Sequence, residues 1–328
     1  MSRQRTAPKG SNQRYKKGRP TTTFCVIMAL IVAAAAVILS LPESNLSWRT
    51  VYSDAGLKPE RENGSCIYYL DVGQADCTAF VSDSAAGLID CGDRSSGSDI
   101  ADELRAKGIE SLAFIIITHA HDDHLGGLLG LLEKMQVDTL FLSDTVGEGE
   151  ENEDMFDAVF EACDKHSVKL DSLSKGDSLT LGEFSFNVLA LDKTDEDVND
   201  RSAVVRVECG DNAFLFTGDA SSKVESELIA SRAELSCDIL KAGHHGSRYS
   251  TSADFLRATN PGLIIFSCGL DNSYSHPSES TLERVRRAGV DYFRTDYNGT
   301  ITVDAKELVA SCEKGEITSP AGRLKAAA

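Results

Sequence analysis

The ten residues THAHDDHLGG at positions 118–127 constrain the fold of this 328-residue chain more than any other stretch. They follow an apolar run at 114–117, which predicts a buried strand, and precede four leucines at 128–132, which predict a helix. The end of a strand is where α/β folds place their chemistry. Four of the ten side chains suit zinc, manganese or iron as ligands, namely His119, His121, Asp123 and His124. The alternative, a polar surface loop, leaves the bracketing strand, glycine pair and helix unexplained.

The first 41 residues predict one membrane span with a basic tail. Residues 1–23 contain seven Lys or Arg and no acid, and residues 24–41 carry no charge. Eighteen such residues just suffice to cross a bilayer, and basic flanks stay in the cytoplasm. We therefore expect a single-pass signal-anchor in the cell membrane, with a cytoplasmic N-terminus and an extracellular catalytic domain. The alternative is a signal peptide cleaved near the small residues 33–36, giving a secreted protein, but these residues lie inside the apolar run.

Beyond the tail the chain is acidic. The net charge of the whole sequence is −18, and setting aside the seven basic tail residues leaves a net charge of about −25. Such a field repels polyanions unless a metal ion or a local basic patch offsets it. It is also a common means of keeping a protein soluble.

The remaining sequence predicts a linker at 42–65, a folded domain at 66–305 and a C-terminal tail at 306–328. The expected strands are 67–70, 78–81, 87–89, 114–117, 139–142, 179–181, 184–189, 203–207, 213–216, 239–240, 263–266, 292–293 and 301–303. The expected helices are 100–107, 128–132, 155–166, 223–232 and 279–288. Strands and helices alternate without one regular βαβ period. The pattern favours an α/β (α+β) fold of two mixed sheets covered by helices over a barrel.

Three further stretches also follow predicted strands and carry polar side chains. The first is TGD at 217–219, where a glycine precedes Asp219 and the carboxylate could bridge two ions. The second contains His244 and His245, and the third is NSYSHP at 272–277. Because strand ends can meet at one edge of a sheet, these stretches are candidates to join the cluster at 118–127.

The combination of HxHxDHxGG, TGD and HHGS resembles the metallo-β-lactamase superfamily. The motifs DVGQAD at 71–76, IDCG at 89–92, KAGHHGS at 241–247, NSYSHP at 272–277 and RTD at 294–296 are similar to those of one branch. That branch is the extracellular hydrolase domain of ComEC-type competence proteins, and the resemblance covers residues 66–303. It implies an αββα sandwich with two divalent metal ions, zinc or manganese, in a cleft between the β-sheets.

The resemblance also implies how the ligands divide. His119 and His121 would hold the first ion, Asp123 and His124 the second, and Asp219 would bridge them. His244 or His245 would complete the second site, and we prefer His244 because it comes earlier after the strand. Many superfamily members supply a third histidine to the first ion, but no histidine lies between 166 and 219 here. The equivalent stretch is NDRS at 199–202, so we expect a weaker first site or a harder ion such as manganese.

Other roles follow from the same resemblance. Asp123 is expected to orient a hydroxide, and His276 to protonate the leaving oxygen or only to shape its proline-terminated loop. Ser247 is expected to touch a substrate phosphate or to cap a helix, and Asn272 to bind substrate. The residues expected to support the ligands from behind are Asp71, Gln74, Asp76, Asp90 and Asn199.

The favoured function is a membrane-anchored, outward-facing phosphodiesterase or nuclease acting on DNA. With one predicted span the chain forms no pore, so moving DNA would require a separate channel protein; no oligomeric state is predicted. The first alternative is a phosphodiesterase or esterase acting on a cell-wall polymer or a small molecule, which suits the acidic surface better. The second is a non-catalytic binding module of the same fold, and the complete set of ligand residues argues against it.

Overall fold

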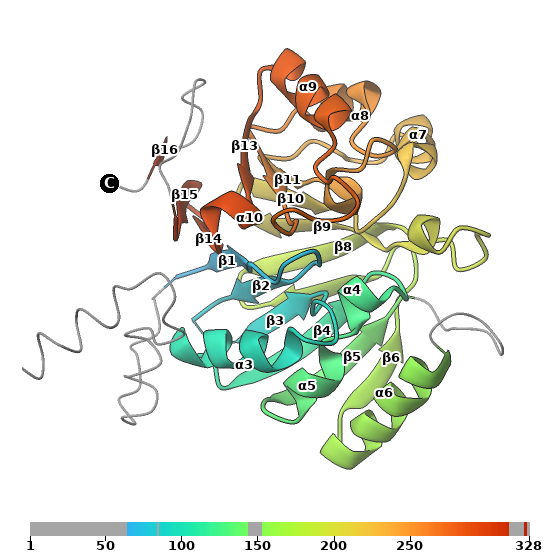
Figure 1. Ribbon diagram of the computed structural model, residues 1–328, viewed down its shortest axis with the longest axis vertical. Coiled ribbons are helices and arrows are strands. Elements are labelled where there is room, and N and C mark those ends of the chain that lie inside the picture. Colours follow the sequence, from blue (N-terminus) through green and yellow to red (C-terminus); the bar gives the residue numbers. More distant parts are fainter. Residues whose placement is uncertain (1–63, 84, 144–152, 315–324, 327–328) are drawn as a thin grey trace, which may run out of the picture. The chain divides into compact units, whose positions relative to one another are not determined.

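The computed structural model describes residues 64–83, 85–143, 153–314 and 325–326 (Figure 1), all of them within one unit, Lys58–Ala328. The predicted tail at 1–23 and the predicted span at 24–41 lie outside these residues. Among the helices of the described part, none has the length and apolar character needed to cross a membrane.

The first sheet has nine strands in the order β16-β15-β14-β1-β2-β3-β4-β5-β6. Its strands are β1 (Cys66–Tyr69), β2 (Thr78–Val81), β3 (Ala86–Ile89), β4 (Ser111–Ile117), β5 (Gln136–Leu142), β6 (Lys169–Ser172), β14 (Ile301–Asp304), β15 (Val309–Cys312) and β16 (Lys325–Ala326). The strands β3, β4, β5 and β6 run parallel to one another. The first half of the chain thus builds most of this sheet, and strands from the far end of the chain extend it.

The second sheet has seven strands in the order β13-β12-β11-β10-β9-β8-β7. Its strands are β7 (Ser178–Leu181), β8 (Phe184–Ala190), β9 (Val204–Cys209), β10 (Asn212–Phe216), β11 (Ile239–Lys241), β12 (Leu263–Phe266) and β13 (Asp291–Arg294). Here β10 to β13 form the parallel part. Each sheet therefore has an edge at which several parallel strands end together.

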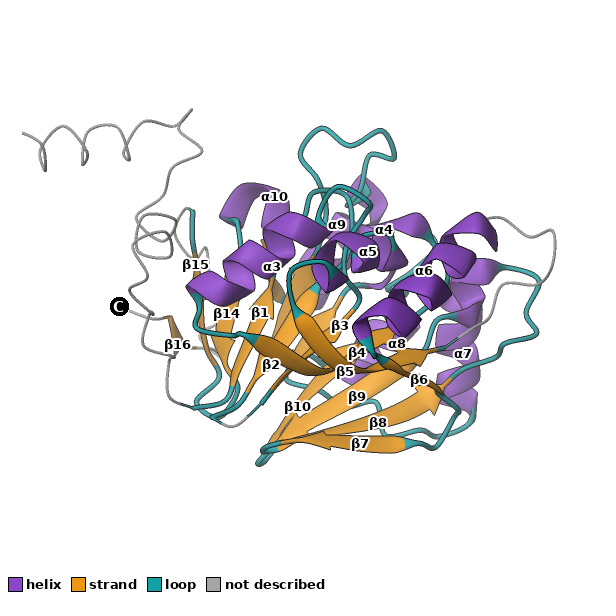
Figure 2. Cartoon of the chain, turned by 90° about the horizontal axis from the view of Figure 1, so that it is seen from below, coloured by secondary structure: helices purple, strands orange, loops and turns teal. Residues whose placement is uncertain are grey.

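Helices cover the outer face of each sheet, at the top and at the bottom of Figure 1, and Figure 2 looks onto the lower group from below. The helices of the described part include α3 (Gly97–Ala106), α4 (Asp122–Leu125), α5 (Leu128–Leu132), α6 (Glu153–His166), α7 (Ser222–Ala230), α8 (Ala253–Thr259), α9 (Glu279–Ala288) and α10 (Thr295–Asn298). The helices α3, α5 and α6 share a buried apolar cluster with the first sheet, and α7 to α9 share another with the second sheet. The order of layers is helices, sheet, sheet, helices, which confirms the predicted αββα sandwich.

The two sheets face each other across an aromatic core. Phe80 on β2 is fully buried, and its ring lies 5.6 Å, 4.9 Å and 5.2 Å from the rings of Phe184, Phe186 and Phe216 in the second sheet. The three interplanar angles of 70–80° are edge-to-face arrangements, which aromatic quadrupoles favour. This contact holds the sheets face to face and so determines how their strand ends meet.

The structure adds elements that the sequence patterns did not predict. The strand β6 has an exposed, polar sequence at the edge of the sheet, so it lacks the apolar alternation that identifies a strand. The helix α8 is only seven residues long and begins after Ser252, whose side chain accepts from Phe255 N. The strand β15 lies inside the predicted tail at 306–328 and pairs with β14. The sheet therefore continues beyond the predicted boundary at 305.

Replacing Phe80 by alanine should lower the free energy of unfolding by about 3–5 kcal/mol, because it leaves a cavity between three rings. Phe160→Ala is the matched control: this ring on α6 is 39% exposed, and its loss should cost less than about 1 kcal/mol. Urea unfolding followed by circular dichroism measures both. Equal losses in the two variants would contradict a core centred on Phe80.

Candidate metal centre

The turn after β4 brings three histidine rings together. His119 is the second residue after β4, and the single helical turn α4 carries Asp123 and His124. The rings of His119 and His124 are fully buried with centroids 4.1 Å apart, and His119 Nε2 lies 3.1 Å from His121 Nδ1. Burial and the neighbouring His124 lower the pKa of His119 well below its usual value. His119 is therefore neutral, which is the form that binds a metal.

Asp219 reaches this cluster from the second sheet. It follows β10, and its backbone N–H donates to Ser202 Oγ at 3.0 Å. Gly218 precedes it with φ of +51°, and a Cβ there would lie 2.9 Å from Ser202 Cβ and 3.0 Å from Thr118 Oγ1. Glycine is needed at this position because both the conformation and the close approach exclude a side chain. The buried Asp219 carboxylate then lies 3.3 Å from His124 Nε2.

The two adjacent histidines after β11 point in different directions. Both have left-handed backbones, with φ of 50° for His244 and 52° for His245. His245 turns inward: it is buried, and its Nε2 lies 3.2 Å from Asp123 Oδ2 and 3.6 Å from Asp219 Oδ2. His244 faces the open side, with a side chain 28% exposed and Nε2 3.6 Å from Asp219 Oδ2. The geometry favours His245 for the second position, contrary to our preference for His244, because the left-handed turn sends the later residue inward.

Four residues form a compact group of donors. One ligand atom from each of Asp123, His124, Asp219 and His245 lies within 4.8 Å of the others. Among the described residues, the buried atoms His124 Nε2 and Asp219 Oδ1 have no hydrogen-bond partner. Buried polar atoms are normally satisfied, so these two atoms, 3.3 Å apart, suit a cation that both could contact. Imidazole and carboxylate donors fit a divalent ion such as zinc or manganese.

The electrostatics of the cluster point the same way. Burial opposes protonation of His245, but Asp219 and Asp76 outweigh it and raise its pKa to about 10. Burial likewise opposes a charge on His124, and Asp219 and Asp90 raise its pKa well above the usual value. The carboxylates create a field that stabilises positive charge at the ring nitrogens, and a divalent cation would satisfy the same field.

Two buried carboxylates support these rings from behind. Asp90 accepts from Thr118 N at 2.8 Å and lies 2.8 Å from His124 Nδ1. Asp76 lies 3.1 Å from His245 Nδ1 and pairs with Lys241. Burial opposes ionisation of Asp76, but Lys241, His245 and His124 outweigh it and lower its pKa to about 2. Carboxylates that hold the second ring nitrogen orient a histidine toward a metal.

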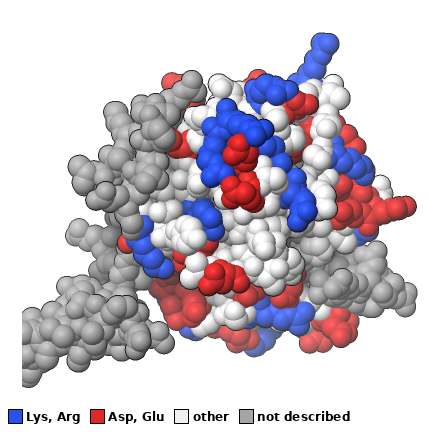
Figure 3. Space-filling view, turned by 45° about the horizontal axis from the view of Figure 1, so that its top comes forward, with Lys and Arg blue, Asp and Glu red and all other residues white. Residues whose placement is uncertain are grey.

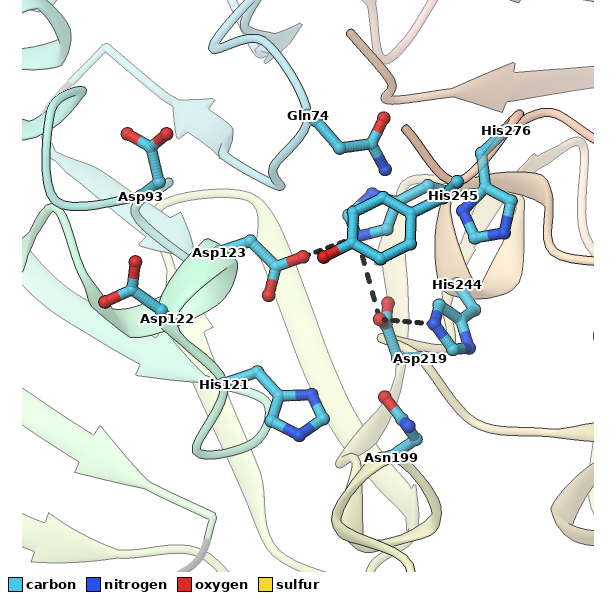
Figure 4. A pocket seen from close by; sticks show the side chains of 11 residues that line it. Gln74, Asp93, His121, Asp122, Asp123, Asn199, Asp219, His244, His245 and His276 are labelled. Atoms are coloured by element: carbon cyan, nitrogen blue, oxygen red, sulfur yellow. Dashed lines mark hydrogen bonds and ion pairs between the residues drawn. The ribbon is translucent and has the colours of Figure 1, made fainter. Parts of the chain in front are cut away.

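The cluster forms one wall of an open pocket of about 460 Å³ (Figure 4). Its lining residues come from both halves of the chain and are Gln74, Asp93, His121, Asp122, Asp123, Asn199, Asp219, His244, His245, Tyr274 and His276. A second hollow, lined by Ser247 and Tyr249 among others, shares Tyr274 and His276 with it. The pocket therefore contains eight of the residues predicted for the site, while His119 and His124 are buried.

Three predicted residues have other tasks. Asp71 Oδ2 lies 3.4 Å from Lys314 Nζ instead of facing the ligands, because it precedes the turn that carries Gln74 and Asp76 inward. Asn272 uses its amide within its own loop: Nδ2 donates to Gly269 O, and Oδ1 accepts from His276 N at 2.9 Å. Ser247 is buried and accepts from Tyr249 N at 3.4 Å, whereas Ser252 caps the next helix. Only the alternative of helix capping by Ser247 is wrong, because Ser252 caps α8; ligand support by Asp71 and substrate contact by Asn272 stay predictions.

The sequence patterns missed Lys241, whose buried ammonium group neutralises Asp76. A signal was present, since a lysine at the end of an apolar strand needs an anion when buried. Asp93, Asp122 and Tyr274 were also missed as pocket residues. Tyr274 is 68% exposed and its ring stacks on His276 with centroids 5.7 Å apart.

Comparisons with known proteins agree with this geometry. A family model described as "Metallo-beta-lactamase superfamily" matches residues 70–268. The chain is 33% identical to ComE operon protein 3 of Bacillus subtilis over 63% of the chain and 26% of that protein. It is 29% identical to competence protein ComA of Neisseria gonorrhoeae over 83% of the chain and 38% of that protein. The chain thus spans well under half the length of either relative.

A solved structure shares the fold. The metallo hydrolase Igni18 from the archaeon Ignicoccus hospitalis superposes with a TM-score of 0.50 at 14% identity, over 74% of this chain and 100% of that one. At this level of identity the likeness concerns the fold alone. It agrees with the two-sheet architecture described above.

The metal-free protein should lose stability as the pH rises. The raised pKa of His245 contributes stabilisation that is complete below its unfolded value near 6.5 and is lost as the pH rises to 10, on the order of 5 kcal/mol. With zinc or manganese present the trend should reverse, because the metal competes with protons for the rings. Urea unfolding between pH 6 and pH 10, with chelator or with metal, measures both slopes. The same slope in both conditions would contradict a metal centre at His245.

Proposed function

Because the chain belongs to the metallo-β-lactamase superfamily, whose members are generally metal-dependent hydrolases, we propose that it hydrolyses phosphodiesters and that its polymer substrate is DNA. The observation that carries the hydrolytic part is the compact group Asp123, His124, Asp219 and His245 on the wall of an open pocket. Similarity to a competence protein supports DNA as the substrate, since competence is the uptake of DNA.

We assign the ligands as follows. Asp123, His124 and His245 would hold one divalent ion, His119 and His121 would hold the other, and Asp219 would contribute to both sites. When bound, such ions lower the pKa of water and neutralise the charge that develops on a phosphodiester. Burial opposes ionisation of Asp123, but its hydrogen bond to His245 and the charge of His124 hold its pKa well below the usual range. Asp123 is therefore an anion at neutral pH and can accept a hydrogen bond from an attacking water.

His276 is placed to contact the substrate. It lines the pocket, its ring centroid lies 5.5 Å from that of His244, and its buried Nδ1 has no hydrogen-bond partner among the described residues. Burial, His245 and His244 lower the pKa of His276 to about 4. A neutral ring at pH 7 suits donation of an N–H hydrogen bond to a substrate oxygen better than delivery of a proton by an imidazolium.

The acidic composition supports the alternative substrate, a cell-wall polymer or another small phosphodiester or ester. Repulsion of DNA by a negative surface is reduced if basic side chains gather locally. Figure 3 displays a face on which Lys and Arg form patches beside Asp and Glu, so that face is not uniformly negative. DNA therefore remains the first proposal. A binding module without catalysis is the least supported, because Asp123, His124, Asp219 and His245 lie together as a compact donor group.

The experiment offers the purified chain bis(p-nitrophenyl) phosphate, single- and double-stranded DNA, and wall polymer, each with manganese or zinc. We expect hydrolysis of the small diester and of DNA. Asp123→Asn should lower kcat at least about 100-fold, because the water loses its acceptor and the ion a ligand.

Asp254→Asn is the matched control, since this carboxylate on α8 is exposed and paired with Arg257. It should keep wild-type activity. Failure to hydrolyse any diester with either metal would refute the phosphodiesterase, and hydrolysis of wall polymer but not DNA would favour the alternative substrate.

We further propose that residues 24–41 anchor the domain outside the cell and that a separate channel protein would carry any transported DNA. The support is the basic tail before an uncharged run of 18 residues. Protease added to intact cells should remove the domain while the basic tail stays protected. Full protection of the domain would contradict this topology, and release of the domain into the medium would indicate cleavage of a signal peptide.

A further inference from the structure

Asn199 has an amide oxygen that faces the metal pocket without a partner. It belongs to the short 3₁₀ turn η1 (Val198–Arg201), just before β9. Asp197 Oδ1 accepts from both Asn199 N at 3.0 Å and Asn199 Nδ2 at 3.1 Å. The amide nitrogen is thus committed to Asp197, which determines that the other terminal atom is the oxygen. That oxygen is buried and has no hydrogen-bond partner among the described residues.

The position of this amide is tightly held. The next residue, Asp200, accepts from Ser221 N at 2.9 Å, and Ser202 Oγ accepts from Asp219 N at 3.0 Å. Ala203 N donates to Thr118 O at 2.9 Å, at the start of the histidine turn. The segment is therefore bound to both turns that carry the metal ligands. In Figure 4 the Asn199 oxygen points toward Asp219, on the side of the pocket where His121 lies.

We propose that Asn199 Oδ1 completes the first metal position together with His119, His121 and Asp219, and that it makes this position select manganese over zinc. The inference rests on the proposed two-ion centre. It assigns to Asn199 direct contact with the ion, whereas the sequence pattern predicted only support from behind. Two imidazoles and two oxygens form a harder donor set than three imidazoles, and amide oxygen is a ligand typical of manganese, magnesium and calcium. A neutral amide also adds no charge to the carboxylates already present.

The alternative is that Asn199 only closes the turn onto Asp197. Such a role predicts that the side chain matters for local stability but not for metal content. The two roles therefore differ in a quantity that can be measured without substrate.

The test uses the full chain purified in detergent, stripped with chelator and dialysed against manganese, zinc or an equal mixture of both. Bound metal is measured by mass spectrometry and folding by thermal melting. Asn199→Ala should weaken the binding of one of the two manganese ions at least tenfold and leave the binding of the other unchanged. Asn199→Asp should retain both, because a carboxylate also offers oxygen. Asn199→His should move the preference of that position toward zinc at least tenfold.

The control is Asn187→His, the same substitution on β8 at a partly exposed position. It should leave metal content and preference unchanged. Wild-type manganese affinity at both positions in folded Asn199→Ala would overturn the proposal, and so would an Asn199→His variant that still selects manganese. Two bound ions without any diester hydrolysis would contradict the proposed function and would leave the proposal for Asn199 unaffected.

Discussion

The buried negative charge of Asp219 is the constraint on which the rest of the site depends. A carboxylate removed from water must be compensated, and here imidazole rings from both halves of the sandwich approach it: His124 at 3.3 Å, and His244 and His245 at 3.6 Å. Its turn requires Gly218 for the close approach and Ser202 for the backbone hydrogen bond. The elements around Asp219 are therefore positioned so that its buried carboxylate is compensated by nearby imidazole rings.

This compensation explains why the pocket lies at the strand ends of both sheets. The buried apolar clusters stabilise each half, and the aromatic contact around Phe80 aligns the two halves. Once the sheets are aligned, the turns after β4, β10 and β11 meet at one edge. A common edge of parallel strands is a frequent location for ligands in α/β proteins. The chemistry thus follows from the packing between layers more than from any single loop.

The sequence was sufficient for the layers and for most of the candidate ligand residues that the structure brings together, because apolar periodicity and donor type are both visible in it. It could not separate His244 from His245, since their left-handed backbones are set by the tight turn between Gly243 and Gly246. It could not tell Asp71 from Asp76 either, because only the turn decides which carboxylate faces inward. The sequence patterns did not predict the polar strand β6 or the strand β15 near the C-terminus. Pairing with neighbouring strands, and not local composition, makes these segments extended.

The pairing of Lys241 with Asp76 has a consequence for the order in which the molecule is assembled. These two residues are 165 positions apart, yet each is the main countercharge of the other in the buried interior. During synthesis, Asp76, Asp90 and His124 are made long before Lys241 and His245. Asp90 already has His124 as a partner within the first half, but until the later strands arrive Asp76 would be buried without its main countercharge, at a cost of several kcal/mol. The first half of the sandwich can therefore close its polar edge only when the second half has left the ribosome.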